Sequence, residues 1–132
     1  MKGDILWCKD FRFPDGTIVP KFFVVLNEPK PDIPRLIAMT TSQQHEKLDR
    51  EGCHSAKGYY VFNRGVDFFD TEKTWVLFDT VREYRTTEFE KFEKLYNPER
   101  KAALKEQNLQ AIINCFRNWK DALPYYRNLL KE

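Results

Sequence analysis

The chain has 132 residues, a length that predicts one domain and excludes a large multi-domain enzyme. Hydrophobic residues make up 42% and aromatic residues 15% of it, enough apolar surface to fold, so an intrinsically disordered chain is excluded. The 22 Lys and Arg against 20 Asp and Glu give a net charge of +2, which excludes a broad basic surface for nucleic acid. Any nucleic-acid contact is therefore expected to be a local site.

The N-terminal segment lacks the features of a membrane or secretion signal. No apolar run approaches the roughly 20 residues that span a bilayer. Asp4 and Lys9 interrupt the first apolar residues, where a signal peptide needs an unbroken stretch. We therefore expect a cytoplasmic protein that does not partner a membrane.

Glycine and proline divide the chain into two parts of different composition. All five glycines lie within residues 1–65, and five of the seven prolines lie within residues 14–34. Both residue types favour turns and disfavour helix interiors. The sequence therefore predicts a turn-rich β part over residues 1–85 and a helical part over residues 86–132.

The β part contains short runs rich in β-branched and aromatic residues, separated by turn residues, which is the usual strand signal. Pro14-Asp15-Gly16 favours a tight hairpin turn between the first two runs. The continuously apolar residues 22–26 indicate a strand that is covered on both faces. Five such strands would suit a small, strongly bent antiparallel barrel, and we expect them at residues 4–9, 17–26, 35–41, 57–62 and 74–82.

The helical part opens with Thr87 and Glu90, whose spacing forms a capping box. Asn97-Pro98 then suggests the N-cap and first residue of a second, longer helix, which Pro124 ends or bends. An apolar stripe of helical period follows this second helix, and we expect it to cover the barrel or a partner. Residues 125–130 are apolar enough to dock on the domain or on another subunit. The stripe consists of Leu109, Ile112, Ile113, Phe116 and Trp119.

The cysteines and histidines do not form a recognisable metal or catalytic pattern. Cys8, Cys53 and Cys115 are odd in number and far apart, which fits neither a disulfide framework nor paired zinc ligands. We therefore expect three reduced thiols. Cys53 and His54 are adjacent, so on an extended chain they would point to opposite sides and could not act together. We expect no metal and no other cofactor, with His45 and His54 at the surface or in loops.

Four segments, in this order along the chain, carry a resemblance to a known family: KGDILW, VPKFFVVL, LIAMTTSQ and TWVLFDTVREY. Over about residues 2–85 the chain resembles the MazF/PemK-like toxins of type II toxin–antitoxin systems. The resemblance implies a small SH3-like antiparallel β-barrel, so we expect an α+β, mainly β fold with a C-terminal helical extension. It also implies an endoribonuclease that cleaves single-stranded RNA without a metal. The implied partners are a cognate antitoxin and a second copy in a homodimer.

The resemblance places catalytic residues at three positions. Lys21 stands where the family usually has the arginine of an Arg-Pro pair, Thr41 lies in the hydroxyl-bearing segment, and Asp79 matches the carboxylate. In this family the 2′-hydroxyl of the RNA attacks the adjacent phosphate. That chemistry needs a base, an acid and a group that stabilises the phosphorane charge. Thr40 and Ser42 are expected to contact substrate, although the three hydroxyls also suit a helix cap before residues 43–48.

Other residues of the first 85 suggest an RNA groove, since cations bind phosphates and rings stack on unpaired bases. Arg64, Arg82 and Tyr60 are the substrate-binding candidates. The alternative is that these aromatic strands form the core and a dimer surface. The neighbouring residues with the same character are Tyr59, Phe62, Tyr84 and Arg85.

Two substitutions keep a second class of function open. Lys21 lacks the planar guanidinium that holds two phosphate oxygens, and Leu77 stands where some members of the family have an arginine. Lys21 would then be a solvated lysine at a strand start, and Asp79 a turn former. The alternatives are a catalytically inactive binding or regulatory module and a plain nucleic-acid-binding barrel.

Overall fold

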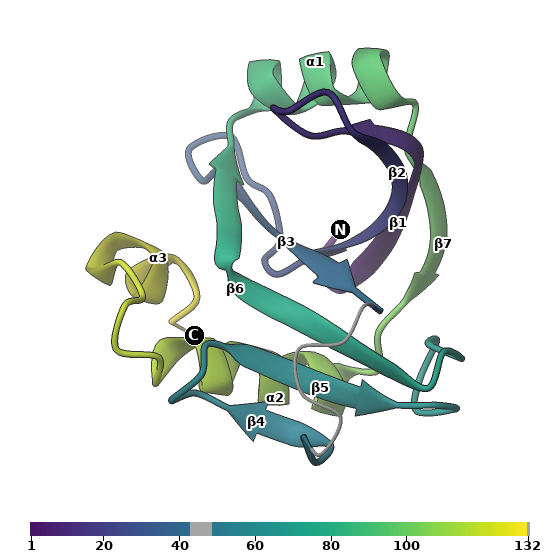
Figure 1. The fold of residues 1–132 in the computed structure, drawn as a ribbon. Coiled ribbons are helices and arrows are strands. Elements are labelled where there is room, and N and C mark those ends of the chain that lie inside the picture. Colours follow the sequence, from purple (N-terminus) through teal and green to yellow (C-terminus); the bar gives the residue numbers. More distant parts are fainter. Residues whose placement is uncertain (43–48, 132) are drawn as a thin grey trace.

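The computed structural model describes residues 1–42 and 49–131. Its one antiparallel sheet has seven strands in the order β4-β5-β6-β3-β2-β1-β7, which confirms the predicted mainly β, α+β class. The sheet is strongly curved, and it is not closed because β4 and β7 are its two edges (Figure 1). No helix among the described residues is long and apolar enough to cross a membrane. The strands are β1 (Asp4–Arg12), β2 (Ile18–Val25), β3 (Arg35–Thr41), β4 (Gly52–His54), β5 (Tyr59–Asn63), β6 (Lys73–Tyr84) and β7 (Glu99–Ala103), and the helices are α1 (Thr86–Tyr96), α2 (Glu106–Arg117) and α3 (Pro124–Leu129).

The five predicted strands correspond to β1, β2, β3, β5 and β6. The hairpin turn at Gly16 is also present, with a positive φ of 92° that favours glycine. The sequence did not predict β4 and β7, the two edge strands. β4 has only three residues, and β7 has the charged sequence ERKAA, which is typical of an exposed edge. Residues 43–48, the segment that the predicted cap would precede, lie outside the described residues, and His45 is among them.

The prediction that Asn97-Pro98 begins a helix is wrong. Asn97 ends α1 in the left-handed conformation, with φ of 45°, and its N–H donates to the carbonyl of Glu93. Pro98 leads into β7, which pairs with β1, and α2 begins only at Glu106. The capping interaction of α1 lies two residues before the predicted one, since Glu88 accepts a 2.8 Å hydrogen bond from the N–H of Arg85.

The apolar stripe of α2 packs against the sheet, as predicted. Leu109, Ile112, Ile113 and Phe116 are buried in the main core, with Trp119 packed beside them. Helix α2 contacts β4 and β5 (Figure 1). Residues 86–132 therefore share one hydrophobic core with residues 1–85, and they also supply β7 of the sheet. Pro124 is the first residue of α3, and Leu130 after α3 is buried in the same core.

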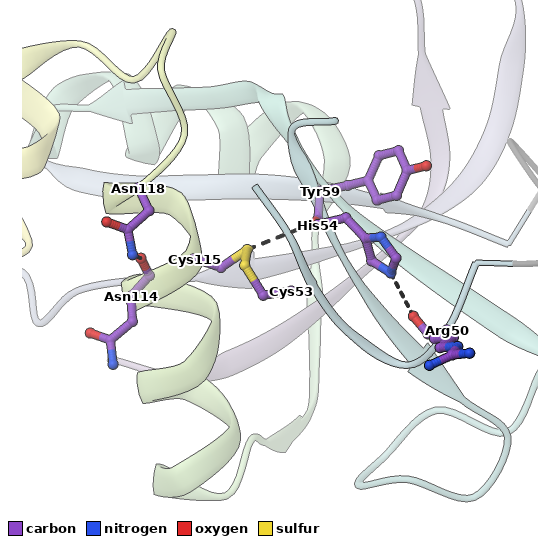
Figure 2. The surroundings of a disulfide bond; sticks show 7 residues. All are labelled: Arg50, Cys53, His54, Tyr59, Asn114, Cys115 and Asn118. Atoms are coloured by element: carbon purple, nitrogen blue, oxygen red, sulfur yellow. Dashed lines mark hydrogen bonds between the residues drawn. A yellow bond between two sulfur atoms is a disulfide. The ribbon is translucent and has the colours of Figure 1, made fainter. Parts of the chain in front are cut away.

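A disulfide joins Cys53 of β4 to Cys115 of α2 (Figure 2). The prediction of three reduced thiols is therefore wrong, and Cys8 is the one free cysteine. The two cysteines are 62 positions apart in the sequence, so the sequence does not reveal that they are close in space. Cys115 lies on the buried face of α2, which packs on β4, so the helix places it opposite Cys53. Burial raises the pKa of Cys8 to about 12, which makes its thiol a poor nucleophile.

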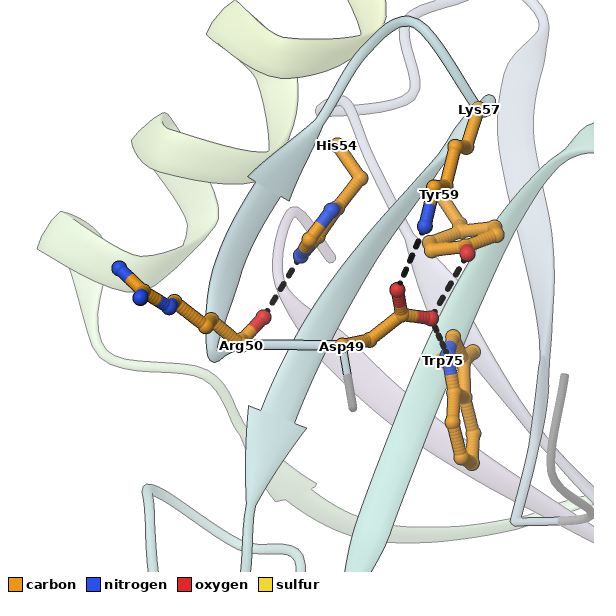
Figure 3. A network of polar contacts seen from close by, with 6 residues as sticks. All are labelled: Asp49, Arg50, His54, Lys57, Tyr59 and Trp75. Carbon is orange, nitrogen blue, oxygen red and sulfur yellow. Dashed lines mark hydrogen bonds and ion pairs between the residues drawn. The ribbon is translucent and has the colours of Figure 1, made fainter. Parts of the chain in front are cut away.

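A buried carboxylate, Asp49, joins the segment before β4 to β5 and β6 (Figure 3). It accepts hydrogen bonds of 2.9 Å from Lys57 Nζ, 2.7 Å from the Tyr59 hydroxyl and 3.1 Å from Trp75 Nε1. Burial alone would raise the pKa of Asp49, but these three donors and the Lys57 charge hold it well below its usual range. The Asp49 carboxylate therefore has a structural role, because its hydrogen bonds hold the segment before β4 against β5 and β6.

The N-terminus of α2 is capped by a residue distant in sequence. Lys105, at the N-cap position, makes no side-chain cap. Instead, Asp67 Oδ2 accepts 2.8 Å hydrogen bonds from the Lys105 N–H and from Asn108 Nδ2. Asp67 has a φ of 56°, a conformation that Asp and Asn tolerate better than other side chains.

We expect Asp67→Ala to lower the free energy of unfolding by about 1 to 2 kcal/mol, because it removes this cap and puts alanine in a left-handed conformation. Asp67→Asn keeps the acceptor and the backbone preference, so it should cost less than half as much. Urea unfolding of the three proteins measures the difference. Equal stability of Asp67→Ala and the unmodified protein would contradict the capping role.

Candidate functional site

A cleft of about 990 Å³ opens between the β1–β2 hairpin, the middle of β6 and α1. Its position follows from the fold, because α1 lies across one end of the curved sheet (Figure 1). Four of the predicted site residues line this cleft: Lys21, Thr41, Asp79 and Arg82. They come from β2, β3 and β6, so the sheet brings together residues that are up to 61 positions apart, from Lys21 to Arg82.

An irregularity in β6 places Asp79 at the cleft. Ile37 pairs with Arg82 and Met39 with Leu77. Between these two pairs β3 advances by two positions and β6 by five, so β6 bulges out of the ladder. Thr80 replaces the missing ladder contact, since its Oγ1 accepts from the Met39 N–H at 2.8 Å and donates to the Leu77 carbonyl at 2.6 Å. Bulges of this kind redirect side chains. Asp79 is left exposed within the cleft lining.

Lys21 lies half-buried on β2, opposite Cys8 of β1. Its Nζ is 5.8 Å from the centre of the Phe13 ring, a cation–π distance. Partial burial lowers the pKa of the Lys21 ammonium, because desolvation disfavours its charged form. A lysine in this environment gives up its proton more readily than one in water.

The three adjacent hydroxyl residues occupy different environments. Thr40 is buried, and its Oγ1 donates to the Phe22 carbonyl at 3.1 Å, so that hydroxyl holds β3 to β2. Thr41 is also buried, whereas Ser42 is exposed just beyond the end of β3. All three line a second hollow of about 350 Å³. Lys21 and Thr41 line both hollows, so the two meet at these residues.

The structure does not bring every candidate to the cleft. Tyr60 is buried in the main core with its ring 5.1 Å from that of Phe62, and Arg64 is exposed in the turn after β5. Neither lines either hollow. Tyr59 is buried in a separate core cluster. Of the aromatic and basic set that suggested an RNA groove, only Arg82 and Tyr84 line the cleft.

The sequence did not point to the cleft residues that come from the hairpin and α1. These include the basic residues Arg12 and Lys91 and the aromatic residues Phe13 and Tyr96. The only signal for them was basic residues beside aromatic ones, as in the segment FRF at residues 11–13. With them, the basic lining residues outnumber the acidic ones, with Arg12, Lys21, Arg82 and Lys91 against Asp79 and Glu88.

Within residues 1–42 and 49–131, no group of three or more His, Cys, Asp and Glu side chains is arranged to hold a metal ion. His54 Nε2 lies 2.6 Å from the Arg50 carbonyl oxygen, which fixes the ring beside β4 (Figures 2 and 3). Cys53 is bonded to Cys115 and so has no thiol to pair with His54.

The fold and the cleft together define a mainly β protein with a local basic and aromatic cleft that contains two exposed carboxylates, Asp79 and Glu88. Comparison of the chain with protein-family models, with curated protein sequences and with solved structures found no match.

Proposed function

We propose that the cleft binds single-stranded RNA and cleaves it without a metal. The observation that carries this proposal is that Lys21, Thr41, Asp79 and Arg82 line one cleft. Its excess of basic residues suits phosphate, and its rings suit unstacked bases. A local site of this kind agrees with a chain whose net charge is only +2.

The cleft offers side chains for each part of the reaction. In our proposal, the Asp79 carboxylate accepts the proton of a ribose 2′-hydroxyl, whose oxygen then attacks the adjacent phosphorus. The bond from phosphorus to the 5′-oxygen of the next nucleotide breaks, and Lys21 donates a proton to that oxygen. The products are a 2′,3′-cyclic phosphate and a 5′-hydroxyl. The lowered pKa of Lys21 favours this proton donation.

The remaining charge falls on the phosphate oxygens in the transition state. Arg82 is exposed on the same strand as Asp79 and supplies a cation for these oxygens. The Thr41 hydroxyl, in the wall next to Lys21, is proposed to contact the same phosphate. Lys21, Thr41 and Asp79 are thus the proposed catalytic residues, with Arg82 as a binding residue.

The proposal extends to architecture, partners and location. We propose that the curved sheet is an SH3-like barrel of the MazF/PemK-like kind, and that the protein acts as a homodimer. An antitoxin of acidic character would suit the basic cleft and block it. The proposed location is the cytoplasm, where an endoribonuclease of this kind meets RNA.

The test is incubation of the purified protein with single-stranded RNA in EDTA. We expect cleavage, and we expect Asp79→Asn and Lys21→Met each to reduce its rate by about 100-fold or more, the usual contribution of a general acid or base. The matched controls are Asp10→Asn and Lys9→Met, which change exposed β1 residues outside both hollows and should leave the rate unchanged.

Cleavage that persists in both site variants would show that the assignment is wrong. Binding of RNA without cleavage would instead favour the binding module. Leu77 is the specific observation in favour of that second function, because an apolar side chain lines the cleft where a further cation would assist catalysis. In that case Lys21→Met should still weaken RNA binding.

A further inference from the structure

The second hollow, of about 350 Å³, lies next to the proposed cleavage site and takes no part in the proposed cleavage reaction. Lys21 and Thr41 form the boundary that it shares with the cleft. A phosphate held at Lys21 would therefore have the cleft on one side and this hollow on the other. The volume is at the small end of the range for ligand pockets, which suits a single base.

The walls of this hollow include three partly buried aromatic rings. Phe22 lies between the other two, with ring centres 4.4 Å from Trp7 and 5.3 Å from Phe68. Phe22 and Phe68 pack against the main core, and all three rings are partly exposed and line the hollow. Single-strand sites combine a basic groove for the backbone with aromatic side chains on which the bases stack.

Some polar groups of the hollow already form hydrogen bonds within the protein, and others do not. Thr71 and Thr74 share a 2.9 Å hydrogen bond between their hydroxyls. The Asp70 carboxylate and the Ser42 hydroxyl are exposed, and within the described part of the chain neither makes a hydrogen bond or ion pair. The hollow thus presents a carboxylate and a hydroxyl beside a set of rings.

We propose that this hollow binds one guanine base of the RNA, next to the phosphate held at Lys21. The inference rests on the proposed function, because it assumes that RNA lies in the neighbouring cleft. An ionised carboxylate only accepts hydrogen bonds and has two oxygens to do so. Guanine is the RNA base whose Watson–Crick edge carries two adjacent donors, N1–H and the 2-amino group, and Asp70 accepts from both.

The other bases meet the same carboxylate less well. Uracil offers one N–H donor between two carbonyl oxygens, which an anionic carboxylate repels. Adenine and cytosine each offer an amino group beside an unprotonated ring nitrogen, which faces the second carboxylate oxygen. The Ser42 hydroxyl can also donate a hydrogen bond to guanine O6. Asp70 is therefore the specificity residue of the hollow, and Lys21 binds phosphate whatever the base.

The experiment measures binding separately from cleavage. Fluorescently labelled 2′-O-methyl pentanucleotides cannot react, because the attacking hydroxyl is blocked. Their affinities are compared for UUGUU, UUAUU, UUCUU, UUUUU and UUIUU, where I is inosine, a guanine analogue without the 2-amino group. The proteins compared are the unmodified chain, Asp70→Asn, Lys21→Met and the control Asp10→Asn.

We expect UUGUU to bind about tenfold more tightly than UUUUU, the usual discrimination of a paired two-bond contact. UUIUU should lose most of this preference, and Asp70→Asn should reduce it to about twofold or less. Lys21→Met should weaken every pentanucleotide, and Asp10→Asn should change none of them.

The outcomes separate the two proposals. Equal binding of all pentanucleotides, weakened throughout by Lys21→Met, would overturn the guanine site and support the RNA cleft. A guanine preference that survives Asp70→Asn would also overturn the assignment to this hollow. No binding of any pentanucleotide by the unmodified protein would overturn both proposals.

Discussion

Replacing Cys53 by serine is expected to lower the free energy of unfolding by about 4 kcal/mol, the entropy that closure of a loop of this length removes from the unfolded chain. The disulfide joins residues separated by 62 positions and ties the edge strand β4 to α2. A three-residue edge strand has few other contacts, so we expect β4 to be the first strand to detach. Guanidinium unfolding at neutral pH measures the loss.

The control for this prediction is chemical reduction. Reduction should destabilise the unmodified protein by about the same amount as Cys53→Ser and should leave a Cys53→Ser/Cys115→Ala variant unchanged. Under denaturing conditions without reductant, a maleimide should label Cys8 alone, because it is the free cysteine. Labelling of Cys53 and Cys115 as well would show that the disulfide does not form.

The same labelling bears on where the protein acts. Disulfides persist in oxidising compartments and are rare in the cytoplasm, where thiol systems keep cysteines reduced. The redox state of the two cysteines can be measured in cells that make the protein, by acid quenching followed by alkylation of free thiols. Cys53 and Cys115 in the reduced form would support the cytoplasmic proposal, and the disulfide form would contradict it.

The fold could be predicted where the signal is local. Residues 22–26 are continuously apolar, and they form the end of β2 and the residue after it, with Phe22 partly buried and residues 23–26 buried. The stripe from Leu109 to Trp119 has helical period, and it packs on the sheet as expected. Such patterns reflect burial on one face, which each segment carries in its own residues.

The fold could not be predicted where distant contacts decide. Asn97-Pro98 suits a helix start, but asparagine also tolerates the left-handed conformation that ends one. Pairing of β7 with β1 selects the second possibility, and no local pattern in ERKAA reveals it. The Cys53–Cys115 bond was missed for the same reason, because it depends on how α2 packs on β4.

The residues of the candidate site also differ in whether the sequence alone could identify them. The family resemblance placed Lys21, Thr41 and Asp79, and all three line the cleft. It could not place Lys91, because the orientation of α1 over the sheet decides which of its faces meets the cleft. The sequence does not reveal that Tyr60 lies in the core and away from the cleft. Strand β5 is buried on both faces from Tyr59 to Phe62, so it has no polar alternation to mark an outer face.

Replacing Asp49 by asparagine is expected to lower the free energy of unfolding by about 3 kcal/mol, the range for losing a buried, hydrogen-bonded charge. The residue is only 4% exposed, and its carboxylate accepts hydrogen bonds from Lys57, Tyr59 and Trp75 (Figure 3). Asparagine keeps the shape, but it removes the charge and turns an NH₂ group toward donors. Asp10→Asn, which changes an exposed carboxylate, is the matched control.

The pH dependence gives this prediction a sign. The folded state holds the pKa of Asp49 well below its usual range, whereas in the unfolded chain it is about 3.9. The contribution of Asp49 is therefore fully present above about pH 5 and is lost as the pH falls through the unfolded value toward the folded one. The stability difference between the unmodified protein and Asp49→Asn should be constant from pH 7 to 5 and should shrink below about pH 4.

Asp4 and Asp15 also have lowered pKa values, but both remain in the two proteins and cancel in that difference. Denaturant unfolding at a series of pH values from 7 to 3 makes the comparison. A difference that stays constant down to pH 3 would show that Asp49 stabilises by shape and not by charge. Lys57→Met should then leave the stability unchanged, whereas the ion pair predicts that it destabilises the protein and raises the pKa of Asp49.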